Sequence, residues 1–579
     1  MPNTKEILSV CLSEVNSSER ASLVAEIPGV NSKDFIECWH IQTYIEDDGM
    51  AKSVVFYIGF PPLFPYTLPS VYFLDRQYDY MPHVETSRKL CLEPDGTCFK
   101  IVSPINLIQH CLNKGTSLLQ KGVLKSNFGD FAEEINIYWR MHYNGEPHSM
   151  SECLIYKSFP VETCQMDAFF WNFELRDERS LDCSRIVITA KNEEDDYFKK
   201  QIENRNSVTK RDALYITSFR VPNTPPYDIT FLDILQRVSE NDKKQITKYV
   251  NEQNGGLIVF KLNDYCLGGF FISKQEKLKK RPGFSRPLTP CYVLQTLEGK
   301  HQKQQRVIGY IYSSDHIAQR TAGYIMPEKN FIIAGLGSVG SNLVFYLSGW
   351  NNAKFSLIDD QTLQPENIGR HFLGFDSLYK LKAVAMEDYL HSIRPEREVY
   401  HICSTIQEAV LKSDIDVNDS TAVFLCTGDI MTNQFVIDKI KSGEIVKPVF
   451  ILWLEPYAIA AHMVYINPKQ VPADFTLYSD DENMLYKHNL ITDEEYKEHS
   501  EKFVKNEAGC NGEYTNYSGN DVTLMLSAFY PIINRLVSTP GTSICYRWEG
   551  NIQNAETYGI AINAPVDTLQ YGHLSELPL

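Results

Sequence analysis

Short apolar runs alternate with amphipathic stretches along the last part of the chain, from about residue 316 to the end. The stretches between the runs have helical spacing, and the runs themselves have the length of buried strands. This alternation predicts a mostly parallel sheet with helices on both of its faces. The expected strands cover residues 331–334, 355–358, 399–402, 422–425 and 448–453.

The first part of the chain has a different pattern, in which apolar and polar residues alternate. A strand expected over 53–60 runs into a proline-dense stretch at 61–69, and a second strand is expected over 70–74. Prolines end strands and fix turns, so this region is interpreted as a meander with a rigid bend. Stretches with helical spacing follow at 104–119 and 130–141. The pattern therefore predicts an N-terminal α+β domain.

The middle third of the chain mixes strand-like runs with charged helical stretches, and no set of residues in it indicates chemistry. We expect a mixed α/β domain with a structural or docking role. A polar stretch with Gly and Pro at 142–150 precedes this region. The expected domains are residues 1–145, 146–315 and 316–579, and the middle domain has expected strands at 185–189, 256–261 and 268–273 and expected helices at 193–203 and 231–251.

The composition of the 579-residue chain, 43% hydrophobic and 22% charged, is that of a globular protein with several domains. The net charge of −17 argues against nucleic acid as the main partner, because no basic excess is available for phosphates. The N-terminus does not resemble a secretory signal, and no apolar segment reaches the ~20 residues of a membrane helix, so we expect a cytoplasmic protein. The 14 cysteines include no Cys-x-x-Cys pair, which favours core residues and reactive thiolates over a zinc site.

The strand expected at 331–334 ends in a Gly-x-Gly-x-x-Gly turn, formed by Gly335, Gly337 and Gly340. The next expected strand ends in Asp359. Strand, glycine turn, helix, strand and acid are the elements of a nucleotide-binding site. The glycines let backbone N–H groups approach a phosphate at a helix N-terminus, and the acid binds ribose hydroxyls. The alternative is a structural glycine turn in an unrelated α/β domain.

Three further polar residues follow Asp359 in order: Asn367, Arg370 and Lys382. With the glycine turn, they make this part of the chain resemble the adenylating enzymes that activate ubiquitin and ubiquitin-like sulfur carriers, the ThiF/MoeB superfamily. The resemblance implies a Rossmann-like α/β adenylation domain that uses ATP and Mg²⁺ to activate a protein C-terminal carboxylate. A planar guanidinium and a mobile ammonium suit the negative charge that builds up on phosphates in that reaction. A dehydrogenase has no use for this set.

The resemblance also implies a carboxylate after the fourth strand that holds Mg²⁺. Asp429 is the best candidate, although it is displaced by one position from the family's aspartate. The second acid of the family's Asp-x-Asp pair is Gln361 here, so we expect ribose and metal binding to be redistributed. Arg320 occupies the place from which this family often sends an arginine into a partner's ATP site; a solvated helix charge is the alternative.

Members of this family that form thioesters need a cysteine on a segment beyond the ATP site. Cys426 ends an apolar strand and Cys545 lies in a strand-like run, so we expect both to be structural. Cys510 lies in a polar, Gly- and Asn-rich stretch that precedes an apolar helix expected at 522–537. A loop thiol suits attack on an acyl-adenylate, which makes Cys510 the expected nucleophile.

The N-terminal domain resembles ubiquitin-conjugating enzymes in a proline-rich strand–turn at 60–73, a Met-Pro-His-Val motif at 81–84 and a Lys-Leu-Cys-Leu motif at 89–92. The resemblance implies that Cys91 carries the acyl group. His83 stands eight residues before Cys91, where the family has an asparagine thought to support the oxyanion. A histidine ring nitrogen can donate the same hydrogen bond and would add a pH dependence. Cys98 is the local alternative and lacks the flanking motif.

The order of conjugating, middle and activating domains is that of bacterial fusion proteins encoded in CBASS antiphage operons. The resemblance implies that the C-terminus of a cGAS-like nucleotidyltransferase is adenylated, passes as a thioester from Cys510 to Cys91, and is joined to an acceptor amine, such as that of a lysine. Those relatives work as homodimers. Three alternatives stay open: a sulfur-carrier-type adenylyltransferase without ligation, a nicotinamide- or flavin-dependent oxidoreductase, and a catalytically silent scaffold.

Overall fold

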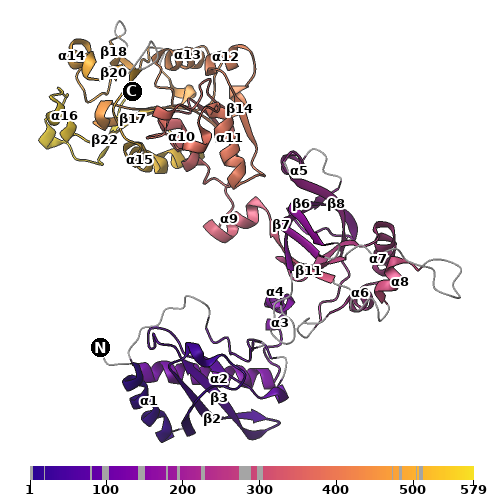
Figure 1. Cartoon of the computed structure of the whole chain (residues 1–579). Helices are drawn as coiled ribbons and strands as arrows, with labels where there is room; N and C mark the ends of the chain where they lie inside the picture. The colour runs from indigo at the N-terminus through magenta and orange to yellow at the C-terminus, as the bar shows by residue number, and fades with distance from the viewer. Residues whose placement is uncertain are drawn as a thin grey trace. The chain divides into compact units, whose positions relative to one another are not determined.

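The computed structural model of the chain (Figure 1) divides into two compact units. The first unit comprises Met1–Glu194 and Arg205–Ser313, and the second comprises Asp195–Asn204 and Ser314–Leu579. None of the helices in the described parts of the chain has the length and apolar character that crossing a membrane requires. The structure describes residues 4–18, 20–78, 81–85, 87–93, 103–140, 150–177, 180–191, 196–205, 207–222, 229–272, 288–295, 304–471, 474–480, 485–503, 505–506 and 513–579.

The N-terminal part of the first unit is an antiparallel sheet of four strands in the order β1-β2-β3-β4, packed against helices. The predicted meander followed by helices is confirmed. Helix α1 was not predicted, although Leu8, Cys11 and Val15 lie on its buried face. The elements are α1 (Thr4–Ser18), β1 (Arg20–Val24), β2 (Glu37–Asp47), β3 (Met50–Phe60), β4 (Ser70–Tyr72), α2 (Pro104–Val123), α3 (Asp130–Glu133) and α4 (Ile135–Trp139).

The rest of the first unit is a closed barrel of seven strands in the order β10-β11-β5-β7-β6-β8-β9. The expected mixture of helices and strands is present, but the barrel has more strands than the sequence pattern predicted. Trp139 of α4 is fully buried in it, and its indole N–H donates to the Val307 carbonyl at 2.9 Å. The elements are β5 (Met150–Tyr156), β6 (Cys164–Asp177), β7 (Ser180–Ala190), β8 (Val208–Ile216), α6 (Phe231–Arg237), α7 (Glu240–Gln253), β9 (Gly256–Lys261), β10 (Cys266–Ile272), α8 (Pro290–Gln295) and β11 (Gln304–Tyr312).

Helix α5 (Tyr197–Glu203) comes between β7 and β8 along the chain, but it belongs to the second unit. The hydroxyl of Tyr197 lies 2.7 Å from Nε2 of His391 and donates to the Val399 carbonyl at 3.2 Å. Val399 opens β14, the first strand in the order of the second unit's sheet. Helix α5 therefore packs at the edge of that sheet.

The second unit contains a sheet of eight strands in the order β14-β13-β12-β15-β16-β17-β22-β23. The predicted parallel arrangement is confirmed for all five predicted strands, β12 to β16. Strands β17, β22 and β23 extend this sheet with antiparallel pairs that the sequence pattern did not predict. Only a short turn joins β16 to β17, and a short connection allows only antiparallel pairing. The strands are β12 (Lys329–Ala334), β13 (Ala353–Ile358), β14 (Val399–Ile402), β15 (Ala422–Leu425), β16 (Val449–Leu454), β17 (Ala460–Ile466), β22 (Ile544–Glu549) and β23 (Leu574–Leu577).

Helices cover both faces of this sheet, as predicted. Alternate residues of β12 point into two different cores: Phe331 and Ile333 pack with α10, α11 and α15, whereas Ile332 and Ala334 pack with α12 and α13. Besides α5, the α-helices of the unit in the described residues are α9 (Ser314–Ala322), α10 (Ser338–Leu347), α11 (Lys382–Ile393), α12 (Ile406–Leu411), α13 (Ile430–Lys441), α14 (Asp493–Glu498), α15 (Gly519–Ser538) and α16 (Gln553–Tyr558). Two short strand pairs, β18 (Tyr478–Asp480) with β19 (Leu485–Tyr486) and β20 (Lys505–Asn506) with β21 (Glu513–Tyr514), complete it.

Candidate functional site

The glycine turn joins β12 to α10, and two of its glycines are required by the geometry. Gly335 has φ +84°, and a Cβ there would meet the Thr427 backbone nitrogen at 2.6 Å. A Cβ on Gly340 would meet the Gly335 carbonyl oxygen at 1.8 Å. Gly337 is different: it precedes α10 without a side-chain cap, and a Cβ on it would meet no heavy atom within 4 Å. The N-terminus of α10 is therefore open to a phosphate on the Gly337 side.

Two buried side chains hold Leu336, the residue between the first two glycines. Asp359, which follows β13, accepts hydrogen bonds from the Leu336 N–H at 2.6 Å and from the Gln361 N–H at 2.9 Å. Burial raises the pKa of Asp359, and the nearby Lys382 ammonium and the two N–H groups oppose that effect. His371 lies 2.8 Å through Nε2 from the Leu336 carbonyl, and its Nδ1 accepts from the Leu373 N–H.

His371 is therefore a neutral imidazole with its proton on Nε2. Burial lowers its pKa to about 4. No motif in the sequence points to His371, because its partner Leu336 lies in the glycine turn, 35 residues away.

Lys382 and Asn367 lie on the segments that follow Asp359 along the chain. Lys382 is the first residue of α11, is 5% exposed, and donates from Nζ to Oε1 of Gln361 at 2.8 Å. Gln361 is thus the neutral partner of the lysine at the position where the family has an acid. Asn367 accepts from the Gln364 N–H through Oδ1 at 3.0 Å, and its amide N–H₂ group can donate to a ligand.

Arg370 makes contacts that the sequence did not predict. Its Nη1 donates to the Thr515 carbonyl at 2.7 Å, and its guanidinium lies 4.7 Å from the centre of the Tyr517 ring. The Tyr517 hydroxyl lies 2.7 Å from the Ser338 hydroxyl, at the first residue of α10. Tyr517 therefore links Arg370 to Ser338, the residue that follows Gly337 in the glycine turn.

Asp429 and Arg320 have simpler surroundings. Asp429 caps α13, where it accepts hydrogen bonds from the N–H groups of Met431 and Thr432. The described residues contain no group of three or more His, Cys, Asp or Glu side chains that suits a metal ion. A single carboxylate still fits Mg²⁺ bound chiefly to phosphates and water, so the assignment of Asp429 stays a prediction. Arg320 is exposed on α9, and its proposed contact with a partner also stays a prediction.

The expectation that Cys426 and Cys545 are structural is confirmed, because both are buried. Burial raises the pKa of Cys545 to about 12 and that of Cys426 further still, which disfavours their thiolates. Cys403, which follows β14, is exposed, and partial burial with the Asp359 carboxylate raises its pKa. Cys510 and Cys98 lie outside the described residues.

Cys91 is exposed in the N-terminal domain, directly after an antiparallel bridge between Val84 and Leu90. Its N–H donates to the His83 carbonyl at 2.8 Å. His83 has φ +61°, a conformation that Asn and His adopt more readily than most residues. A histidine at the family's asparagine position therefore fits the backbone.

The His83 ring lies between two carboxylates from the helices that follow α2. Its Nε2 is 3.0 Å from Asp130 Oδ2, and its Nδ1 is 2.9 Å from Glu134 Oε1. These hydrogen bonds raise the pKa of His83, with Glu134 making the larger contribution. Both ring nitrogens are engaged, so His83 can donate to an oxyanion only by exchanging one carboxylate. Asp130 and Glu134 were not among the predicted site residues.

A second charged cluster involves Glu93, which follows Cys91 by two residues along the chain. Glu93 Oε1 is 2.7 Å from both His110 Nε2 and Lys114 Nζ, which belong to α2. The hydrogen bond from Lys114, with that from His110, lowers the pKa of Glu93. The segment that carries Cys91 is therefore held by charged groups at both ends.

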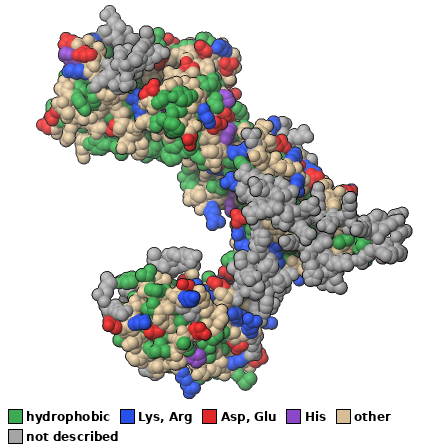
Figure 2. All heavy atoms as spheres, in the orientation of Figure 1, with side chains coloured by type: hydrophobic (Ala, Val, Ile, Leu, Met, Phe, Trp, Pro, Cys, Tyr) green, Lys and Arg blue, Asp and Glu red, His purple; other side chains and the backbone are tan. Residues whose placement is uncertain are grey.

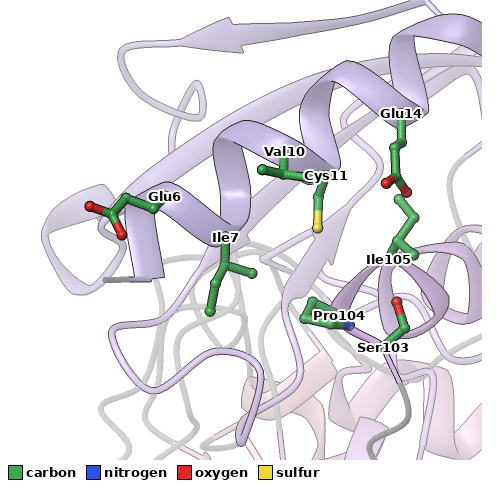
Figure 3. A pocket seen from close by; sticks show the side chains of 8 residues that line it. All are labelled: Glu6, Ile7, Val10, Cys11, Glu14, Ser103, Pro104 and Ile105. Carbon is green, nitrogen blue, oxygen red and sulfur yellow. The ribbon is translucent and has the colours of Figure 1, made fainter. Parts of the chain in front are cut away.

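An apolar pocket of about 350 Å³ lies between α1 and the start of α2 (Figure 3). Burial and the nearby Glu14 carboxylate raise the pKa of its cysteine, Cys11, which disfavours the thiolate. We assign no reaction to it. Its lining residues are Glu6, Ile7, Val10, Cys11, Glu14, Ser103, Pro104 and Ile105.

Acidic and basic side chains are interspersed over the face shown in Figure 2. A nucleic-acid surface would instead have basic side chains clustered on one face, and the net charge of the chain is −17.

Two family models match separate parts of the chain. A model described as the ThiF family matches residues 326–472, which contain the glycine turn, Arg370 and Lys382. A model described as prokaryotic E2 family B matches residues 23–146, which contain His83 and Cys91. The chain therefore combines a conjugating-type domain with a ThiF domain, and most of the middle domain lies outside both matches.

A curated relative is the ATP-dependent ubiquitin transferase-like protein Cap2 of Pseudomonas aeruginosa (strain BWHPSA011 / Pa011). It is 23% identical over 353 residues, which are 57% of this chain and 60% of the relative's length. Among solved structures, Escherichia coli MccB with AMPCPP and MccA matches 38% of this chain and 61% of its own, with 11% identity and a TM-score of 0.30. PaaA matches 43% and 72%, with 14% identity and a TM-score of 0.28.

Proposed function

We propose that this chain, in which a prokaryotic E2-type domain precedes a ThiF domain, is an ATP-dependent protein-conjugating enzyme. A protein C-terminal carboxylate attacks the α-phosphorus of ATP and expels pyrophosphate. The Cys510 thiolate then attacks the acyl-adenylate and releases AMP. Cys91 takes over the acyl group by thioester exchange, and an acceptor amine displaces the Cys91 thiolate to form an amide.

One observation carries this proposal: a single chain contains two different features. The first is a Gly-x-Gly-x-x-Gly turn at the N-terminus of a helix, followed along the chain by Arg370 and Lys382. The second is an exposed cysteine in a conjugating-type domain. An adenylating enzyme without ligation has no use for the second feature. A nicotinamide-dependent oxidoreductase has no use for either the basic pair or Cys91. The conjugating function uses both.

The residues of the ThiF domain divide the first step between them. The open N-terminus of α10 receives a phosphate, and Asp359 holds the turn and takes a ribose hydroxyl. Arg370 and Lys382 face the charge that develops on the phosphates as pyrophosphate leaves, and Asn367 adds an uncharged donor. Asp429 would help to hold Mg²⁺, which would neutralise negative charge on the phosphates.

His83 and its two carboxylates suit the last step. The cluster of one imidazolium and two carboxylates carries a net negative charge, which favours the approach of a lysine ammonium to Cys91. When His83 exchanges a carboxylate for the thioester oxygen, its N–H supports the oxyanion. Asp130 or Glu134 is then available to accept the proton of the amine.

The carboxylate is proposed to be the C-terminus of a cGAS-like nucleotidyltransferase, and the role antiphage defence. The similarity to a protein named ATP-dependent ubiquitin transferase-like protein supports transfer of a protein. The domain order and its resemblance to CBASS fusion proteins support the nucleotidyltransferase. A homodimer in which Arg320 reaches the partner's ATP site completes the proposal.

The test is incubation of the purified chain with ATP, Mg²⁺ and a cGAS-like nucleotidyltransferase encoded beside it, followed by gels with and without thiol. A thiol-sensitive adduct is expected for the native chain. It should be lost in Cys510→Ala, whereas Cys91→Ala should retain the adduct on Cys510 and lose the amide product. Cys403→Ala, at an exposed cysteine of the ThiF unit, is the matched control and should behave as the native chain does.

Three other outcomes would overturn the assignment in different ways. An adduct that forms in Cys510→Ala excludes Cys510 as the nucleophile. Full activity in Cys91→Ala supports the sulfur-carrier-type adenylyltransferase instead. Absence of ATP–pyrophosphate exchange, together with binding of NAD(H), supports the oxidoreductase.

A further inference from the structure

The segment Thr515–Tyr517, five to seven residues beyond Cys510, is fastened to the phosphate-binding residues of the ThiF unit. Resting on the function proposed above, we infer that this segment is a strap that couples occupancy of the phosphate site to the placement of Cys510. In this arrangement Tyr517 is a positioning residue for Arg370. No motif in the sequence indicated the contacts of Tyr517 with Arg370 or with Ser338.

Three contacts fasten the strap. The Thr515 carbonyl accepts a hydrogen bond from Arg370 Nη1 at 2.7 Å, and the Tyr517 ring lies under the same guanidinium. The Tyr517 hydroxyl lies 2.7 Å from the Ser338 hydroxyl, at the first residue of α10. Directly after the strap, a Cβ on Gly519 would meet the Gly369 carbonyl at 3.1 Å, so the start of α15 also lies close to the Arg370 backbone.

Tyr457 ties the strap to the chain on the other side of Cys510. Its N–H donates to the Asn516 carbonyl at 2.6 Å, and its hydroxyl donates to the Lys502 carbonyl at 2.9 Å. Tyr457 has φ +58° and Ala458 has φ +53°, two consecutive non-glycine residues in the left-handed region. Such a conformation is costly and persists where surrounding contacts hold it, often at functional sites.

The coupling follows from the geometry of the guanidinium. A phosphate bound at the N-terminus of α10 would compete with the Thr515 carbonyl for the N–H groups of Arg370, because a charged acceptor makes the stronger hydrogen bond. The same phosphate would lie beside Ser338, the partner of Tyr517. Binding of ATP therefore changes two of the contacts of the strap, and release of AMP restores them.

Linkage makes the effect reciprocal. If bound nucleotide shifts the strap between its fastened and loosened states, then loosening the strap by mutation changes the affinity for nucleotide by the same factor. The experiment is hydrogen exchange of peptides that cover residues 505–518 in the full chain, with and without Mg²⁺ and α,β-methylene-ATP. In the native chain we expect nucleotide to change the exchange rates by about fivefold or more. Tyr517→Ala should abolish most of that change and shift the Kd for the nucleotide by a similar factor. Tyr517→Phe, which retains the ring under Arg370, should show a smaller loss.

Tyr346→Phe is the matched control. The Tyr346 hydroxyl lies 2.6 Å from the Ser527 hydroxyl, so this variant also removes a Tyr–Ser contact between α10 and the region of α15, but near the other end of α10. It should retain the full nucleotide-dependent change.

Two negative results are distinguishable. If the native chain binds the nucleotide and exchanges pyrophosphate but its exchange rates over 505–518 do not change, the strap is refuted and the proposed function stands. If the native chain neither binds nucleotide nor exchanges pyrophosphate, the proposed function itself is refuted. An equal response in Tyr517→Ala and Tyr346→Phe would refute the role of Tyr517.

Discussion

The main-chain N–H of Cys91 donates a hydrogen bond of 2.8 Å to the carbonyl oxygen of His83. The exposed thiol and the imidazole thus belong to one short antiparallel arrangement, and the imidazole is fixed in turn by Asp130 and Glu134. The position of the conjugating cysteine therefore depends on helices that lie some 40 residues further along the chain.

We predict that His83 makes stability decrease as pH rises above about 6.5. The pKa of His83 is raised in the folded chain, so its contribution is complete below the unfolded value of ~6.5 and is lost as pH rises through the raised value. His83→Gln should remove this part of the pH dependence and cost about 1 kcal/mol at acidic pH, since the pair is partly solvated. Urea unfolding across that range measures both effects. An unchanged pH profile in His83→Gln would contradict the prediction.

We predict the opposite pH dependence for His371. Its folded pKa of about 4 lies below the unfolded value, so its contribution is present above pH ~6.5 and is lost as pH falls to 4, by up to about 3 kcal/mol. His371→Gln should flatten this acid limb, because a glutamine does not take up a proton. Thermal unfolding between pH 4 and 7 checks the prediction, and a His371→Gln variant as acid-sensitive as the native chain would count against it.

Two glycines of one turn should respond differently to alanine. Gly340→Ala places a Cβ at 1.8 Å from the Gly335 carbonyl oxygen, so it should destabilise the unit by about 2–4 kcal/mol. Gly337→Ala meets no heavy atom, so stability should change by less than about 0.5 kcal/mol. The new methyl group lies where a phosphate approaches, so the KM for ATP should rise about tenfold. Denaturant unfolding and ATP–pyrophosphate exchange distinguish the two variants, and equal unfolding of both would refute the distinction.

Lys382→Met should abolish most ATP–pyrophosphate exchange. The buried ammonium donates to the neutral side chain of Gln361 and lies near the Asp359 carboxylate, and we expect its charge to act on the phosphates. Loss of a preorganised charge of this kind typically lowers kcat by about 100-fold or more. Lys380→Met is the control, because Lys380 is exposed and pairs with Asp388. Similar exchange rates in both variants would remove Lys382 from the site.

Local spacing indicated the glycine turn and Asp359, because Gly335 and Asp359 follow consecutive strands of a βα alternation. Arg370 and Lys382 were identified through the resemblance to the ThiF/MoeB superfamily, because a single arginine or lysine has no distinctive local pattern. Strand β17 was not among the predicted strands, so the antiparallel part of the sheet was missed.

Residues that act through long-range contacts left no such signal. Tyr517 reaches Ser338 across 179 positions, and Asp130 reaches His83 across 47. A tyrosine before a helix and an aspartate at the start of one are common, and only the folded chain brings them to an arginine or an imidazole. Contacts of this kind follow from packing rather than from spacing.

Helix α5 has a consequence for how the two units can be separated from each other. Because residues 195–204 belong to the second unit, the polypeptide passes between the units three times, after residues 194, 204 and 313. A single protease cut at any one crossing leaves parts of both units on at least one fragment, and a gene fragment starting at residue 314 lacks the tyrosine that binds Val399. Exchange of the chain at residue 313 alone would therefore leave α5 behind with the first unit.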